Sequence, residues 1–283
     1  MEQWLVDHKL PLGEWVKQAI DVLQNNSRFF DAASDFISFM VDGLTSVLLL
    51  VPPLLFIVLA AALTYWLHRS VRLSVFVVLA LLLIVNLGYW EATVQTISLI
   101  GYSAIVSIAI GIPIGIVAAH RPWLYTALRP VLDMMQTLPT FVYLIPTIVL
   151  FGIGAAPGLI STVIFAIPAP IRLTYLGVSS VPPALKEAGQ AFGATRGQLL
   201  RKVELPFALP TIMAGVTQCI MLCLSMVVIA ALVGADGLGK PVVRALGNVN
   251  IPMGFESGLA IVLVAIVLDR VCKWPERRLK GSR

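Results

Sequence analysis

Long apolar segments separated by short polar connections occupy most of the chain from residue 44 onward. A helix needs about 20 mainly apolar residues to cross a membrane, and five segments come near or exceed this length. Two shorter apolar segments complete a consistent topology. The pattern therefore predicts an all-α integral membrane protein with about seven transmembrane helices. These predicted helices cover residues 44–67, 73–90, 92–119, 139–152, 157–178, 207–233 and 254–271.

The composition excludes a soluble globular protein. Hydrophobic residues make up 58% of the 283 residues and charged residues only 12%, whereas soluble domains carry about 25% charged residues. Much of the surface must therefore face lipid. The net charge of +5 does not indicate a nucleic-acid partner, because the basic residues form no groove-like cluster with interleaved aromatic side chains.

The distribution of Lys and Arg orients the predicted helices. Fifteen of the 20 Lys and Arg residues lie in residues 68–72, 120–138 and 172–206 and from Arg270 onward. Cytoplasmic connections are enriched in these residues, so we expect these four segments on the cytoplasmic side. The N-terminus then lies outside and the C-terminus, with a basic tail at 273–283, lies inside.

Residues 1–43 differ from the rest, because they carry three Lys or Arg and seven Asp or Glu. Apolar residues recur at helical spacing between Trp15 and Met40. Such a segment favours an amphipathic helix on the outer membrane surface over a first transmembrane helix.

Ionisable residues are nearly absent from the predicted spans. Only Arg172, Glu256, Asp269 and Arg270 fall within them, each near an end of its span. Ion-coupled transporters place carboxylates or histidines at mid-membrane, so this pattern argues against an ion-driven relay within the chain. The alternative of a secondary transporter that binds an ion through backbone carbonyls stays open.

Two further features do not predict ligand sites. The stretch Gly234 to Lys240 begins like a phosphate-binding GxxxxGK loop, but Pro241 stands where Ser or Thr must hold magnesium. We expect a glycine-rich turn there. Cys219 and Cys223, one helical turn apart, match neither a zinc spacing nor a disulfide, and no metal site is predicted.

The cytoplasmic connection at 180–206 predicts a helix–turn–helix. Ser180 before two prolines is a helix start, Gly193 ends the first helix, Thr195 with Gln198 forms a capping box for the second, and Pro206 ends it. An apolar stripe runs along the first helix at Leu185, Ala188 and Phe192. So short a helix is marginal in water, and it must pack either on its own chain or on another protein.

This loop resembles the EAA loop of permease subunits in bacterial ABC importers. The matching segments are Glu187-Ala-Gly-Gln-Ala-Phe-Gly193 and Val203-Glu-Leu-Pro206, with Gly189 in place of the second alanine. Three more segments resemble the glycine betaine/proline and choline permeases of the osmoprotectant group. They are Gln136-Thr-Leu-Pro-Thr-Phe-Val-Tyr-Leu-Ile-Pro146, Leu205-Pro-Phe-Ala-Leu-Pro-Thr-Ile-Met-Ala-Gly215 and Leu224-Ser-Met-Val-Val-Ile-Ala230.

The resemblance covers about residues 92–271 and implies a multi-pass permease of the bacterial inner membrane with a type I (MetI-like) core at 92–272. Residues 44–91 would form two accessory helices. The family works as a homodimer with two cytoplasmic ABC ATPase subunits, which bind ATP and magnesium, and with an extracytoplasmic substrate-binding protein. The chain itself would then be no enzyme and would bind no cofactor.

The same resemblance implies site residues. The ATPase-coupling loop would contain Leu185, Glu187, Ala188, Gly189, Phe192, Gly193, Leu205 and Pro206. The translocation pathway would contain Met134, Met135, Gln136, Thr137, Pro139, Ser225 and Met226.

The expected substrate is a quaternary ammonium compound, choline or glycine betaine/proline. In this family the binding protein holds the cation in an aromatic cage, so we expect none in the permease. Two alternatives remain: an ABC permease for another small solute, such as an amino acid, or an ion-coupled secondary transporter.

Overall fold

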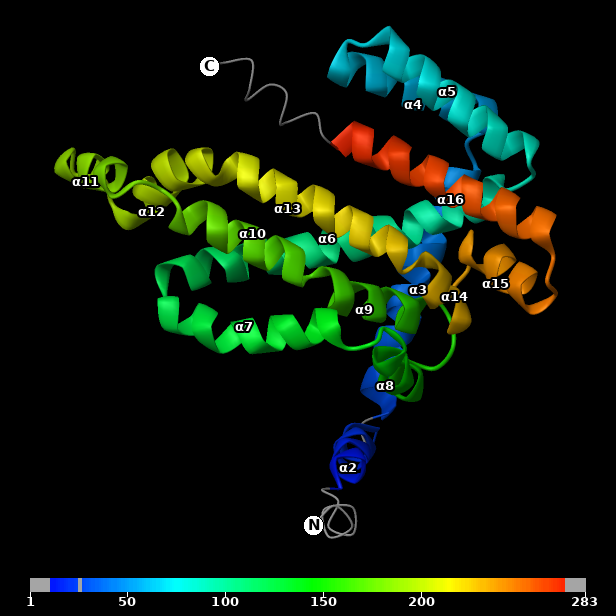
Figure 1. Cartoon of the computed structure of the whole chain (residues 1–283), viewed down its shortest axis with the longest axis horizontal. Coiled ribbons are helices and arrows are strands. Elements are labelled where there is room, and N and C mark those ends of the chain that lie inside the picture. Colours follow the sequence, from blue (N-terminus) through cyan, green and yellow to red (C-terminus); the bar gives the residue numbers. More distant parts are fainter. Residues whose placement is uncertain (1–10, 25–26, 273–283) are drawn as a thin grey trace, which may run out of the picture.

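The computed structural model of the chain describes residues 11–24 and 27–272, and within these ranges every regular element is a helix. Most helices run side by side along the long axis of the molecule, while α3 runs across them (Figure 1). The first half contains α2 (Leu12–Gln24), α3 (Ser27–Leu49), α4 (Pro53–His68), α5 (Val71–Asn86), α6 (Trp90–His120), α7 (Pro122–Thr137), α8 (Phe141–Phe151) and α9 (Ala155–Ala166). The second half contains α10 (Pro168–Ser179), α11 (Pro183–Ala191), α12 (Arg196–Leu199), the π-helical turn η1 (Leu200–Glu204), α13 (Leu205–Ser225), α14 (Val227–Leu232), α15 (Gly239–Gly247) and α16 (Ile251–Cys272).

Helices α6, α10 and α13 form the centre of the bundle and pack closely because small residues line their contacts. A Cβ atom at Gly111 would lie 2.8 Å from the ring of Pro170. A Cβ atom at Gly115 would lie 2.7 Å from the carbonyl oxygen of Ile171. The Gly111–Gly115 spacing thus serves close helix packing, as the small-xxx-small pattern predicts.

One apolar core joins the α4–α5 hairpin to the rest of the bundle. Its buried members include Val77 and Ile84 of α5, Ile100 of α6, Cys219 of α13 and Val264 of α16. The hairpin is therefore not a separate globule, because its buried face is completed by α6, α13 and α16.

Among the described residues, five helices are long and apolar enough to span a membrane, or six when the bent pair α7 and α8 counts as one. The spans predicted at 92–119, 157–178, 207–233 and 254–271 overlap almost completely with four of the five, at 90–120, 155–179, 196–232 and 251–272. The fifth is residues 28–49 of α3; the sequence patterns assigned its residues up to 43 to the membrane surface and the remainder to the first span.

The predicted first span, 44–67, is wrong as a single helix. Pro52 and Pro53 interrupt it, because proline lacks the N–H that a helix interior needs. Residues 44–49 end α3, and α4 begins at Pro53. Both α4 and α5 are apolar helices of 16 residues.

The segment 120–138, predicted as a cytoplasmic connection, is largely helix α7. This helix meets α8 at a bend of 95°. The predicted cytoplasmic position of this segment stays a prediction. In the structure Arg172 of α10 donates to Asp133 at 2.7 Å, so the charged pair joins two neighbouring helices.

Helix α3 has three distinct faces. One face packs on α6 and α9, with Val41 and Thr45 buried. A second carries the exposed acids Asp31, Asp35 and Asp42. The third carries exposed aromatic residues, namely Phe29, Phe36 and Phe39. Water on the acidic face and lipid on the aromatic face match the predicted surface helix, and its placement relative to the membrane stays a prediction.

Candidate coupling site and translocation pathway

The predicted apolar stripe of the coupling loop points away from the rest of the chain. Helix α11 has no buried residue, and Phe192 directly after it is 93% exposed. Leu185 is 44% exposed, and Ala188 and Glu187 are also exposed. The sequence left open whether this apolar stripe packs on its own chain or on another protein. In the structure the stripe does not pack on its own chain.

Two glycines shape the opposite face and the end of α11. A Cβ atom at Gly189 would lie 2.7 Å from a methyl group of Leu199, so glycine lets α11 lie directly on α12. Gly193 has φ +76°, and the N–H of Ala194 donates to the carbonyl oxygen of Gly189 at 3.1 Å. A left-handed residue here ends the helix and satisfies its last carbonyls.

The loop departs from the predicted ends at two positions. Ser180 does not cap α11, since its hydroxyl donates to the carbonyl of Gly177 at 3.0 Å and so closes the end of α10. Pro206 does not end the second helix but lies in the first turn of α13. In a regular α-helix the ring of a proline clashes with the carbonyl group four residues earlier. The wider π-helical turn η1 before Pro206 avoids this clash.

The capping box predicted for the second helix is present. The backbone N–H of Thr195 donates to Gln198 Oε1 at 2.9 Å, and the N–H of Gln198 donates to Thr195 Oγ1 at 3.4 Å. Leu205 packs on the cluster formed by Val178, Ala208 and Ile212. Leu205 thus fixes the loop to its own bundle, whereas Phe192 is exposed.

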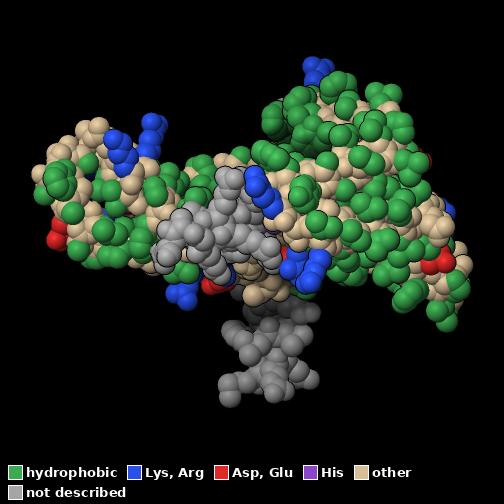
Figure 2. Space-filling model, turned by 90° about the horizontal axis from the view of Figure 1, so that it is seen from above, with side chains coloured by type: hydrophobic (Ala, Val, Ile, Leu, Met, Phe, Trp, Pro, Cys, Tyr) green, Lys and Arg blue, Asp and Glu red, His purple; other side chains and the backbone are tan. Residues whose placement is uncertain are grey.

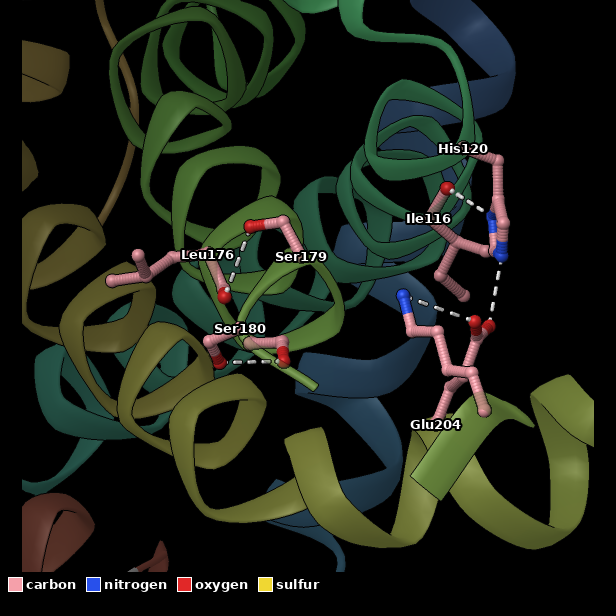
Figure 3. Close-up of polar contacts among 8 residues, drawn as sticks. Ile116, His120, Leu176, Ser179, Ser180 and Glu204 are labelled. Atoms are coloured by element: carbon pink, nitrogen blue, oxygen red, sulfur yellow. Dashed lines mark hydrogen bonds and ion pairs between the residues drawn. The ribbon is translucent and has the colours of Figure 1, made fainter. Parts of the chain in front are cut away.

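The sequence patterns gave no role to Glu204, which proves to be the most buried charged residue of this region at 2% exposure. His120 Nε2, at the end of α6, lies 2.8 Å from Glu204 Oε2 (Figure 3). Lys186 Nζ, on α11, lies 3.5 Å from Glu204 Oε1. We call these three residues the Glu204 cluster; it joins α6, the coupling helix α11 and the π-turn.

A cavity of about 730 Å³ opens beside the Glu204 cluster, between the end of α6 and the coupling helices. Basic side chains of Arg121, Lys186 and Arg196 line it together with Glu204. In the sequence, the only sign of the Glu204 cluster was Glu204 itself, a lone carboxylate immediately before a long apolar segment. Its partners could not be chosen from sequence, because they lie 84 and 18 positions away.

The predicted pathway residues of α7 lie at the end of the helix and at its bend. Met134 is 57% exposed, Thr137 and Pro139 are exposed, and Met135 and Gln136 are half-buried. The hydroxyl of Tyr143, on α8, donates to the carbonyls of Met135 and Leu138. These bonds satisfy backbone oxygens that the bend leaves without helical partners.

The other two predicted pathway residues lie where α13 meets α14. Ser225 is exposed and donates to the carbonyl of Met221 at 3.0 Å. Met226 is fully buried in the protomer, so in this conformation its side chain packs inside the bundle. The role of both residues in the pathway stays a prediction.

The glycine-rich stretch 234–240 is a packed turn. The N–H of Leu238 donates to Thr96 Oγ1 of α6 at 2.8 Å, and a Cβ atom at Gly237 would lie 2.5 Å from the same oxygen. A phosphate-binding loop must direct its N–H groups at the ligand. Here that backbone packs on α6, as expected for a structural turn.

Comparison with known proteins places this architecture in a family. Residues 111–281 match the model of the family described as binding-protein-dependent transport system inner membrane component. The match covers more than half of the chain, which therefore belongs to this family. It is a membrane-embedded permease subunit of the ABC importer type.

Full-length relatives refine the class. The chain is 44% identical to glycine betaine/carnitine transport permease protein GbuB of Listeria monocytogenes over 96% of this chain and 98% of that protein. It is 44% identical to glycine betaine transport system permease protein OpuAB of Bacillus subtilis, covering 93% of each. It is 41% identical to glycine betaine/proline betaine transport system permease protein ProW of Escherichia coli over 97% of this chain and 78% of that protein.

A solved structure supports the fold independently. A chain of the inward-facing MetNI methionine ABC transporter matches with a TM-score of 0.57 and 24% identity, covering 66% of this chain and 93% of that chain. The predicted MetI-like fold is thereby confirmed.

Proposed function

We propose that this chain forms the translocation pathway of an ATP-driven importer for glycine betaine or a closely related quaternary ammonium compound. The names of the three full-length relatives, each of which includes glycine betaine, support this substrate class. Because the substrate carries a fixed positive charge, an aromatic cage suits its capture. We assign that cage to a separate extracytoplasmic binding protein.

The observation that carries the proposed coupling is the exposed stripe of α11. A nine-residue helix with Phe192 and Leu185 exposed gains stability by docking in an apolar groove. We assign that groove to a cytoplasmic ABC ATPase subunit, which binds ATP and magnesium. Two permeases and two ATPases then form the working importer.

The proposed mechanism is alternating access driven from the coupling loop. ATP binding brings the two ATPases together and moves both α11 helices, and hydrolysis releases them. A ligand shifts such an equilibrium only through contacts that differ between the two states. The Glu204 cluster connects α11 to α6, so a displacement of α11 would also displace α6. Because α6 contacts α10 directly at Gly111 and Gly115, α10 would move with it.

Reconstitution tests the proposal. The permease, purified in mild detergent with the proteins that remain bound to it, is placed in proteoliposomes and assayed for uptake of labelled glycine betaine. We expect uptake only with ATP on the ATPase side and with binding protein on the other. The mass of the detergent complex should correspond to two permeases and two ATPases.

Competition experiments decide between a glycine betaine importer and an importer for another solute. A control with the permease alone tests the alternative of an ion-coupled secondary transporter. Excess carnitine, proline betaine or choline should compete with glycine betaine, and methionine should not. Competition by methionine alone would assign the chain to an amino-acid importer. Uptake by the permease alone, driven by an ion gradient, would refute the coupling to a separate ATPase.

A further inference from the structure

A second cavity, of about 380 Å³, lies where the turn between α4 and α5 meets the C-terminal end of α16. Its polar lining consists of His68, Ser70, Arg72 and Arg270. None of the described residues that line it is acidic, and within the described part of the chain neither guanidinium forms an ion pair with a carboxylate. The cavity therefore has the charge of an anion site.

The geometry of the turn adds hydrogen-bond donors to this charge. Ser70 is the N-cap of α5, but its side chain does not cap the helix, so the first N–H groups of α5 keep the partial positive charge of a helix N-terminus. Arg72 lies in that first turn. Arginine forks and helix N-termini are both common ligands of phosphate oxygens.

The remaining lining of the cavity is apolar. Leu73 and Phe76 continue along α5 from the polar turn, and Ile266 faces them from α16. His68 Nε2 lies 3.4 Å from the carbonyl of Val271 and closes the cavity where the hairpin meets α16. A ligand that fits here has an anionic end at the turn and a hydrocarbon part directed along the helices.

The position of the cavity relative to the hydrophobic surface points to lipid. Figure 2 shows hydrophobic side chains over most of the face that α4, α5 and α16 present, with Lys and Arg side chains at the border nearest the coupling helices. The 68–72 turn and the end of α16 lie on the side of the molecule that carries α11 (Figure 1). Helices α4 and α5, of 16 residues each, extend about 24 Å, most of the ~30 Å hydrocarbon core, and long arginine side chains at the turn extend from there toward the headgroups.

We propose that this cavity binds an anionic phospholipid, with the phosphate held by Arg72, Arg270 and the N-terminus of α5, and with the upper acyl chain against Phe76 and Ile266. Basic cavities between spanning helices on the cytoplasmic side are suited to anionic headgroups. A bound lipid of this kind would link the accessory hairpin to α16 and so stabilise the bundle. The proposal does not depend on which solute is transported.

Native mass spectrometry of the full-length permease tests it, with phosphatidylglycerol as the probe and phosphatidylcholine as the zwitterionic comparison. We expect retained phosphatidylglycerol to exceed phosphatidylcholine in the wild type and to fall about tenfold or more in the Arg72→Gln, Arg270→Gln double variant, since both charged donors to the phosphate are lost. Arg69→Gln is the matched control. It removes one positive charge from the same turn as Arg72→Gln, with which it is compared, but Arg69 does not line the cavity.

Further measurements separate a lipid from free phosphate and from loss of folding. Phe76→Ser should weaken phosphatidylglycerol retention, and millimolar inorganic phosphate should not displace the lipid. Thermal unfolding in detergent must show that each variant is folded; Arg72→Lys with Arg270→Lys provides a second, charge-conserving variant that should retain part of the binding. Equal retention of phosphatidylglycerol by the wild type and the double glutamine variant, equal retention of both lipids by the wild type, or displacement by phosphate would overturn the proposal.

Discussion

Two glycines of α6 illustrate how one missing side chain sets the distance between helices. Gly115 faces the backbone of α10, where a Cβ atom would lie 2.7 Å from both the Ile171 oxygen and the Thr174 Cβ. Gly101, on the same helix, has no neighbouring atom within 4 Å of its corresponding Cβ position. The same residue type therefore has different consequences at the two positions.

Substitution by alanine should change the stability of the permease differently at these two glycines. We expect Gly115→Ala to destabilise the permease by about 1–3 kcal/mol, because a methyl group must push α10 away. Gly101→Ala should be neutral or stabilising by up to about 1 kcal/mol, because alanine favours helix. Thermal unfolding in detergent measures both, and equal shifts in Tm would contradict the packing argument.

The Glu204 cluster is the residue-scale feature most directly placed to affect coupling. A buried carboxylate that loses its charge leaves His120 and Lys186 without their partner, and removing one member of a buried pair is costly. We expect Glu204→Gln to reduce transport at least tenfold while the complex still hydrolyses ATP. The ratio of solute imported to ATP hydrolysed in proteoliposomes measures this.

Glu91→Gln is the matched control for Glu204→Gln, because Glu91 is an exposed carboxylate on α6. It should leave both rates within about twofold of the wild type, as surface charges contribute little. If Glu204→Gln also leaves the transport-to-hydrolysis ratio unchanged, the Glu204 cluster has no part in coupling.

At the scale of the element, the coupling helix shows how a short helix can be built to contact something other than its own chain. Its ends are fixed internally, by Pro183 at the start and by Gly193 at the end. Its inner face rests on Leu199 through Gly189. What remains is an outward apolar stripe with no partner in the described chain.

Truncation of that stripe should affect docking and not folding. We expect Phe192→Ala combined with Leu185→Ala to weaken co-purification of the ATPase at least tenfold, since both side chains would be buried only in the complex. The Tm of the isolated permease should change little. Leu246→Ala, which removes an exposed leucine from α15, should leave co-purification intact, and loss in both variants would refute the assignment of the docking face.

The elements also show where sequence patterns had limited power. Apolar length located α6 and α13, since a continuous apolar segment of more than 20 residues has few alternatives to a helix. The same criterion did not locate α7, because Arg129 and Asp133 interrupt its apolar length, whereas in space Asp133 is paired with Arg172. A single charged pair between helices cannot be seen in a one-dimensional pattern.

At the scale of the whole molecule, the accessory hairpin and the permease core form one packed unit. Val77 and Ile84 of α5 share a core with Cys219 and Val264, so the boundary drawn at residue 92 from sequence is not a boundary in packing. The cavity proposed for phospholipid lies at this junction, between α5 and α16. A lipid there would contact both parts of the molecule at the membrane surface.

The sequence by itself determined the class of protein: an all-helical membrane permease with a helix–turn–helix near residues 183–206. Apolar length, scarcity of charge and local helix-ending residues are properties of neighbouring positions, so they can be followed along the chain. Only the tertiary structure decided that Glu204 is buried between His120 and Lys186, that α7 bends into α8, and that two arginines from distant helices line one cavity. Those features depend on contacts between residues far apart in the chain, which arise only when helix packing fixes their positions.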